Sequence, residues 1–352
     1  MRKHPMDEKT SAGVSRGEGV EDLIRQAYSC LKEGDTASAQ SLLKGALEID
    51  FEHPEVLYAL KCLSWWLEKM QRLDEWSDPY EKGEYILSLW KPYHAFLERI
   101  AGAGFSGRNV PVPGESADSC QYALKRFVFS RALEYFLQLL GDGANRQDPS
   151  LLLQAGRCCK GAGEWEEALE YLEQAGRYRR EDSAILSELA DVNALLGDER
   201  AAKVLFREAF FLDPQGIDLM TMESEMIIRL RDKVREAGYT GAELAEWIPV
   251  WGYIWGIFSV KRELKPVELG RLKQSILSLE NEYRSQSQSL KSGARDGALK
   301  GGQSQLTKPR LLNRYFRLID NCEYNRDTSG LRDETMLKIK FIDPVVYEQF
   351  RT

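Results

Sequence analysis

The stretch "GRCCKGAGEWEEALEYLEQA" (residues 156–175) sets four small residues among charged and aromatic ones. The same four offsets hold small residues again 34 residues later. A fixed period of this length is typical of proteins that stack one structural unit repeatedly. The two sets are Gly156, Gly163, Ala168 and Ala175, and then Ala190, Gly197, Ala202 and Ala209.

Each repeat is predicted to be a pair of helices. Apolar residues recur three and four positions apart on both sides of "GAGEW", which is the period of an amphipathic helix. Gly163 lies at the break, where glycine tolerates the left-handed conformation that ends a helix. Small residues let two helix axes approach to within roughly 8–10 Å. The pattern therefore predicts two antiparallel helices that meet at a tight turn.

These residues resemble the tetratricopeptide repeat (TPR) family, whose unit carries a W-x2-L-G-x2-Y, then A-x3-F, then P pattern. Leu152 stands where the family has its first Trp, and Cys159 and Asn193 stand where Tyr is usual. The matching residues of 149–182 are Leu152, Ala155, Gly156, Cys159, Gly163, Trp165, Ala168, Leu172 and Ala175. Those of 183–216 are Leu186, Leu189, Ala190, Gly197, Ala202, Phe206, Ala209 and Pro214.

A third unit begins near the start of the chain, from Val20 to His53. It lies 129 residues before the unit at 149–182, which is not a multiple of 34, so the chain between them must hold irregular helices. The residues at corresponding offsets are Leu23, Ala27, Cys30, Gly34, Ala39, Leu43 and Ala46.

The predicted fold is all-α, with stacked antiparallel helix pairs and additional C-terminal helices. The resemblance implies that the stack is a right-handed TPR-like solenoid. The predicted segments are a flexible tail (1–18), a TPR-like repeat (19–53), a degenerate helical repeat (54–100), a Gly/Pro loop (101–116), a repeat-like helical segment (117–148), two TPR units (149–182 and 183–216), capping helices (217–284), a flexible linker (285–308), and a C-terminal helix with a tail (309–352).

Composition narrows the class of protein. The 352 residues are 43% hydrophobic and 29% charged, which is globular, and the net charge of −7 argues against nucleic acid as the main partner. The six cysteines lack paired spacing and are predicted to be reduced packing residues, with at most one of Cys158 and Cys159 facing a helix seam. The longest apolar run, 247–260, is too short to span a bilayer. We therefore expect a cytoplasmic protein without a transmembrane span.

The sequence gives little material for catalysis. Its three histidines, His4, His53 and His94, have no second ligand at helical spacing, and "GAGFSG" (102–107) lacks the Lys of a phosphate loop. Acidic pairs such as Glu166 and Glu167 fit a solvated helix face better than acid–base chemistry. We predict a protein that is not an enzyme and needs no cofactor or metal.

The TPR resemblance implies an adaptor that binds a partner polypeptide on the concave face, which is lined by the first helix of each pair. Helix geometry predicts solvent-facing residues there, with Arg157 and Lys160 placed to meet carboxylates of the partner. The predicted concave-face residues are Tyr28, Lys32, Leu153, Arg157, Lys160, Ser187 and Asp191.

Two further segments leave alternatives open. The run 247–260 is either a buried capping helix or an exposed docking face that closes a homodimer, through Trp247, Trp251, Trp255 and Phe258. The basic segment 286–317 is either a solvated linker with an ordinary helix surface, or a contact for an acidic partner or anionic lipid. A self-assembly module is therefore the alternative to the adaptor.

Overall fold

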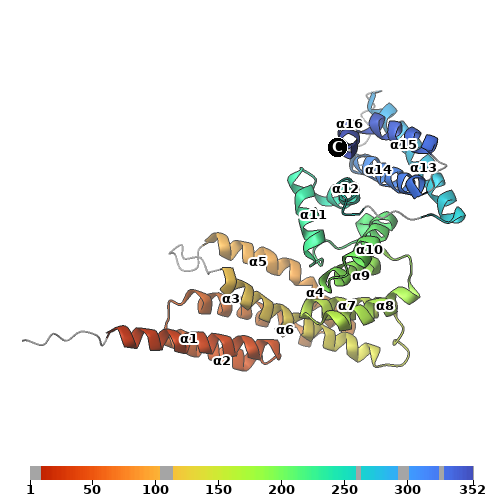
Figure 1. The fold of residues 1–352 in the computed structure, drawn as a ribbon. Helices are drawn as coiled ribbons and strands as arrows, with labels where there is room; N and C mark the ends of the chain where they lie inside the picture. Colours follow the sequence, from red (N-terminus) through yellow and green to blue (C-terminus); the bar gives the residue numbers. More distant parts are fainter. Residues whose placement is uncertain (1–8, 104–113, 259–262, 292–300, 325–328, 352) are drawn as a thin grey trace, which may run out of the picture. The chain divides into compact units, whose positions relative to one another are not determined.

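The computed structural model describes residues 9–103, 114–258, 263–291, 301–324 and 329–351 (Figure 1). These ranges are built of helices and contain no strand, which confirms the all-α prediction for the described part of the chain. The chain divides into two compact units, Met1–Tyr171 and Leu172–Thr352. The right-handed TPR solenoid remains a prediction.

Unit 1 contains helices that pack as sequence neighbours, with α1 on α2 and α6 on α7, while α4 also packs on α6. Helix α8 crosses the boundary between the units. The helices are α1 (Lys9–Lys32), α2 (Thr36–Ile49), α3 (Pro54–Met70), the 3₁₀ turn η1 (Gln71–Glu75), α4 (Pro79–Ser88), α5 (Trp90–Ala103), α6 (Gly114–Leu140), α7 (Pro149–Ala162) and α8 (Trp165–Tyr178).

Unit 2 begins with the pair α9 and α10, which pack against each other, and continues with helices gathered around α14. Helix α14 packs on α12, α13 and α15. The helices are α9 (Ser183–Leu195), α10 (Glu199–Leu212), the 3₁₀ turn η2 (Pro214–Gly216), α11 (Glu225–Glu236), α12 (Gly241–Ile254), α13 (Pro266–Lys291), α14 (Gly301–Tyr324), α15 (Ser329–Ile342) and α16 (Pro344–Arg351).

The turns between paired helices form as the glycine spacing predicts. Gly34, Gly163 and Gly197 have φ angles of 85°, 86° and 89°, the left-handed conformation in which side chains with a Cβ are strained. After Gly34 and Gly197 the next helix starts on a capping aspartate, because Asp35 accepts a hydrogen bond from Ser38 N and Asp198 accepts one from Ala201 N. Local chemistry therefore fixes where each of these helices begins and ends.

The small residues of the repeats are buried, as their role in helix packing requires. Ala168, Ala175, Ala190, Ala202 and Ala209 have no exposed surface. Both Cys158 and Cys159 are buried as well, so the prediction that at most one faces a seam is wrong. Helix α7 buries almost its whole length, from Leu151 to Ala162, and therefore has more than one packed face.

The structure describes all six cysteines, and none forms a disulfide. Burial raises the pKa of the Cys159 thiol to about 12, and it also raises the pKa of Cys158. These two thiols are therefore protonated at neutral pH and act as small apolar groups.

Several predicted boundaries differ from the structure. Helix α1 already begins at Lys9, inside the predicted tail 1–18, and α15 and α16 occupy most of the predicted C-terminal tail. Helices α13 and α14 extend into the predicted linker, and buried Thr307 donates a hydrogen bond to Glu282 across the two helices. The middle of that linker (292–300) and of the Gly/Pro loop (104–113) lies outside the described residues.

The aromatic run at the end of α12 and directly after it belongs to the core of unit 2. Trp247, Trp251 and Phe258 are 5%, 8% and 1% exposed, and Trp255 is half-buried against the same cluster. The alternative of an exposed homodimer face is therefore wrong, because other helices of unit 2 cover these side chains.

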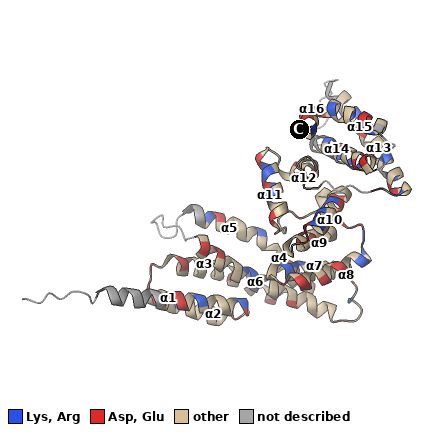
Figure 2. Cartoon of the chain, viewed as in Figure 1, with Lys and Arg blue, Asp and Glu red and all other residues tan. Residues whose placement is uncertain are grey.

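Figure 2 shows acidic and basic residues distributed over the helices of both units. In the described part of the chain, no helix is both long enough and apolar enough to cross a membrane.

Helix packing in unit 1 makes a prediction about two glycines. At Gly83 an added Cβ would lie 2.5 Å from the ring of Phe136, which is fully buried, whereas at Gly45 it would meet nothing within 4 Å. Gly83→Ala should destabilise the protein by about 1–3 kcal/mol through overpacking. Gly45→Ala should stabilise helix α2 by about 0.5–1 kcal/mol. Urea unfolding measures both, and equal midpoints would contradict the described packing of α4 on α6.

Candidate functional site

Most of the predicted concave-face residues do not face solvent. Of the seven, only Lys32 is exposed, and Arg157 is half-buried. Lys160 is 1% exposed, and Ser187 and Asp191 are fully buried. Tyr28 and Leu153 are also buried, and the Tyr28 hydroxyl donates a hydrogen bond to Glu55 of α3. The prediction of a solvent-facing groove at these positions is therefore wrong.

In unit 2 the reason is visible, because a segment without helical structure, residues 217–224, lies against α9. Asp191 accepts hydrogen bonds of 2.8 Å from the backbone N–H groups of Glu223 and Ser224. Thr221 donates another to Glu188, at 2.8 Å. The predicted capping region starts at 217, but its first helix, α11, begins only at Glu225, and the non-helical residues before it cover this face.

Asp191 is therefore expected to stabilise the fold rather than to bind a partner. Asp191→Ala leaves two backbone donors without their acceptor and should cost about 1–3 kcal/mol. Among the described residues, the exposed Glu199 forms a surface ion pair with Lys203, so Glu199→Ala should cost less than about 0.5 kcal/mol. Thermal unfolding of the two variants checks this difference. A melting temperature for Asp191→Ala equal to that of Glu199→Ala would contradict it.

Unit 1 contains a pocket of about 480 Å³ that includes the predicted site residue Lys32. Its charges are largely matched, since Arg131 pairs with Glu134 and Glu33 and Asp74 add further negative charge. Lys32 itself lies over the ring of Tyr122, 5.2 Å from its centroid. The pocket has no excess of positive charge for an acidic ligand.

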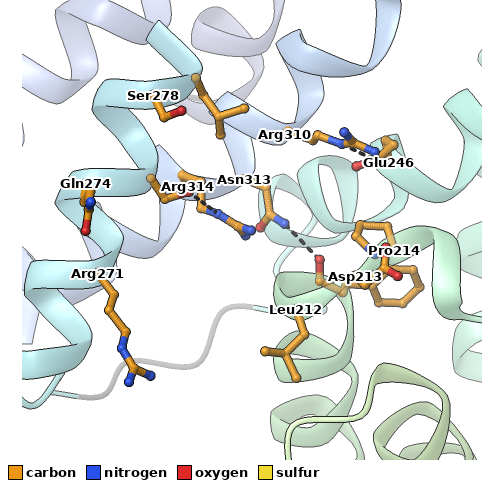
Figure 3. A pocket seen from close by; sticks show the side chains of 13 residues that line it. Leu212, Asp213, Pro214, Glu246, Arg271, Gln274, Ser278, Arg310, Asn313 and Arg314 are labelled. Atoms are coloured by element: carbon orange, nitrogen blue, oxygen red, sulfur yellow. Dashed lines mark hydrogen bonds and ion pairs between the residues drawn. The ribbon is translucent and has the colours of Figure 1, made fainter. Parts of the chain in front are cut away.

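A pocket in unit 2 has a different character. It has a volume of about 570 Å³, and its walls come mainly from α13, α14 and the C-terminal end of α10. Figure 3 shows Arg271, Gln274 and Ser278 along one side, and Arg314 and Asn313 pointing toward the end of α10. The lining residues are Phe210, Leu212, Asp213, Pro214, Glu246, Arg271, Gln274, Ser275, Ser278, Leu279, Arg310, Asn313 and Arg314.

One of the three arginines, Arg310, already has a carboxylate partner. Its Nε and Nη2 atoms both donate to Oε1 of the buried Glu246, at 2.8 and 2.6 Å. Gln215 donates to the same oxygen at 3.0 Å. These hydrogen bonds raise the pKa of Arg310, and they join α12 to α14.

Arg314 is half-buried, and its acceptors are neutral. Its Nη1 donates to the carbonyl oxygen of Phe211 at 2.6 Å, and its Nε donates to Ser275 Oγ at 3.3 Å. Its guanidinium lies over the Phe211 ring, 3.9 Å from the centroid. Within the described part of the chain, no carboxylate forms an ion pair with Arg314.

The environment of Arg314 disfavours its charge. Burial lowers its pKa to about 10, and nearby Arg317 and Arg310 act in the same direction while Glu246 opposes them. Arg314 is therefore still a cation at neutral pH, in surroundings where an added anion would be stabilised.

Arg271 provides the second unpaired positive charge. It is exposed on α13, and no hydrogen bond or ion pair joins it to any residue that the structure describes. Its side chain borders the same pocket as Arg314 (Figure 3). The pocket thus combines these two cations with the carboxylate of Asp213 and the polar groups of Gln274 and Ser278, while the Asn313 amide donates to the carbonyl oxygen of Phe210 at 3.1 Å.

The sequence drew attention to only part of this site. Arg310, Arg314 and Arg317 lie in the basic segment 286–317, and their spacing of four and three positions puts them on one helix face. This spacing is the feature of the sequence that indicates a common site for the three arginines. Arg271 and Glu246 come from other helices, and nothing in the local sequence connects them to α14.

No family model matches the chain, and no curated protein matches it either. The fold and the pocket are therefore the basis for a functional proposal.

Proposed function

We propose that this chain is a non-enzymatic adaptor built on TPR-like helix pairs, and that it binds an acidic segment of a partner polypeptide in the arginine pocket of unit 2. The observation that carries the proposal is the cation of Arg314 in a pocket wall without a carboxylate partner among the described residues. Side-chain carboxylates of a polypeptide are suitable ligands, because guanidinium groups bind them with charge-assisted hydrogen bonds.

The overall charge of the protein favours a specific site over general attraction. With a net charge of −7, the chain as a whole repels acidic polypeptides. Binding of such a partner therefore requires a local surface where positive charge is not balanced. The pocket lining holds three arginines against two carboxylates, Asp213 and Glu246, so one positive charge is in excess, and Gln274 and Ser278 offer further polar groups beside it.

A second element of the proposal is the cellular location. The six cysteines are all without disulfides, which suits a reducing compartment, and we include the cytoplasm in the proposal. In the described part of the chain, no group of three or more His, Cys, Asp or Glu residues is arranged to hold a metal ion.

A charge reversal at Arg271 tests the proposed site. Fluorescence anisotropy would compare short labelled peptides rich in Asp and Glu with matched peptides in which Asn and Gln replace the acids. We expect the purified chain to prefer the acidic peptides, and Arg271→Glu to weaken their binding by at least about tenfold. Because Arg271 is exposed, the melting temperature should not change.

Lys273→Glu provides a matched control on the same helix. Lys273 is exposed on α13 and does not line the pocket. Its replacement by Glu changes the net charge of the protein by the same amount as Arg271→Glu. Its effect on binding should be less than about twofold, because a solvated charge outside the pocket is screened. Equal losses in the two variants would show general electrostatics, and equal binding of acidic and neutral peptides would reject the proposed function.

A further inference from the structure

A second pocket adjoins the arginine pocket and shares four of its lining residues. It encloses about 480 Å³ and lies entirely within unit 2. The shared residues are Leu212, Arg271, Ser275 and Arg314. Any chain segment bound at Arg271 and Arg314 therefore lies beside this second pocket.

The adjoining pocket brings five apolar side chains together among charged ones. Leu186 of α9 and Phe211 of α10 line it together with the buried Leu264 and Leu272. The arginine pocket, in contrast, gathers polar groups from α13 and α14. The two neighbouring pockets thus suit different kinds of side chain.

The charged groups at the rim of the adjoining pocket are mostly engaged within the protein. Arg317 forms an ion pair with Glu208, and Glu268 accepts a hydrogen bond from the backbone N–H of Lys265 at 2.8 Å. Arg180 and Glu181 complete the charged rim, and the apolar side chains lie beside it as the surface that suits an apolar ligand group.

The apolar wall is also held in place. Arg314 and Arg317 lie over the ring of Phe211, at 3.9 and 5.0 Å from its centroid. The backbone N–H of Leu264 donates to Asn321 Oδ1 at 2.9 Å. A prearranged apolar surface reduces the entropy that a ligand must lose on binding.

We infer that the partner segment carries an acidic residue close to a large apolar residue, with the carboxylate at Arg271 and Arg314 and a leucine-like side chain in the adjoining pocket. This inference rests on the proposed function. An extended chain advances about 3.3 Å per residue, so neighbouring pockets with a common wall are reached by residues about two to four positions apart.

A peptide series with the wild-type chain tests the inference directly. The reference peptide holds one Glu and one Leu, and the variants replace Leu by Ala, replace Glu by Gln, or change the spacing from one to six positions. We expect Leu→Ala to weaken binding by at least about fivefold, because burying the side chain removes apolar surface from water. Spacings of about two to four should bind most tightly.

A double-mutant cycle places the leucine in the adjoining pocket. Leu186→Gln should weaken binding of the Leu peptide at least about threefold more than that of the Ala peptide, because the two residues are expected to be in contact. Leu277→Gln is the control, since Leu277 is 59% exposed on α13 and lines neither pocket. If Leu186→Gln unfolds the protein, the peptide series still decides the question.

The outcomes separate this inference from the proposed function. If the Glu peptide binds and Arg271→Glu weakens it, but Leu→Ala and the spacing have no effect, the inference is overturned while the proposed function stands. If the peptide with Gln binds as well as the peptide with Glu, the proposed function fails. Binding through leucine alone would then make the surface an apolar site, which also overturns the inference.

Discussion

The structure of unit 2 depends on how the positive charge of helix α14 is compensated as the helix becomes buried. A buried charge without a partner is costly, so each arginine needs an acceptor. Arg310 pairs with Glu246 of α12, and Arg317 pairs with Glu208 of α10. Nearer the C-terminal end of α14, Asp320 forms an ion pair with Arg207 and accepts a hydrogen bond from Tyr253. These contacts fix α10 and α12 against α14 in one arrangement.

The same requirement creates the candidate site. Arg314 donates hydrogen bonds to the backbone carbonyl of Phe211 and to Ser275 Oγ. Phe211 lies in the last turn of α10, where carbonyl groups have no N–H donor within the helix. The partial negative charge at a helix C-terminus stabilises a cation, but less than a carboxylate does. A pocket whose wall holds such a cation is stabilised further by an anionic ligand. The guanidinium group of Arg314 therefore contributes both to the packing of α10 on α14 and to the proposed binding site.

Much of the fold was predictable from local chemistry. The 34-residue spacing of small residues and the glycines at 163 and 197 located the turn between α7 and α8 and the turn between α9 and α10. The site was predicted less well. The basic segment indicated Arg310, Arg314 and Arg317, but the preferred residues Lys160, Ser187 and Asp191 proved to be buried. Helical periodicity identifies one packed face of a helix. Helices α7 and α9 are packed on more than one face, so residues expected to face solvent are buried.

The sequence by itself determined the turns at Gly34, Gly163 and Gly197 between paired helices, because glycine turns and apolar spacing act over a few neighbouring residues. Only the tertiary structure decided which helix faces stay accessible. Residues 217–224 cover Asp191 from 32 and 33 positions away, and Arg317 meets Glu208 across 109 positions. The physical reason is that burial of a face depends on the element that packs over it. That element is selected by the whole set of long-range contacts, which local periodicity does not contain.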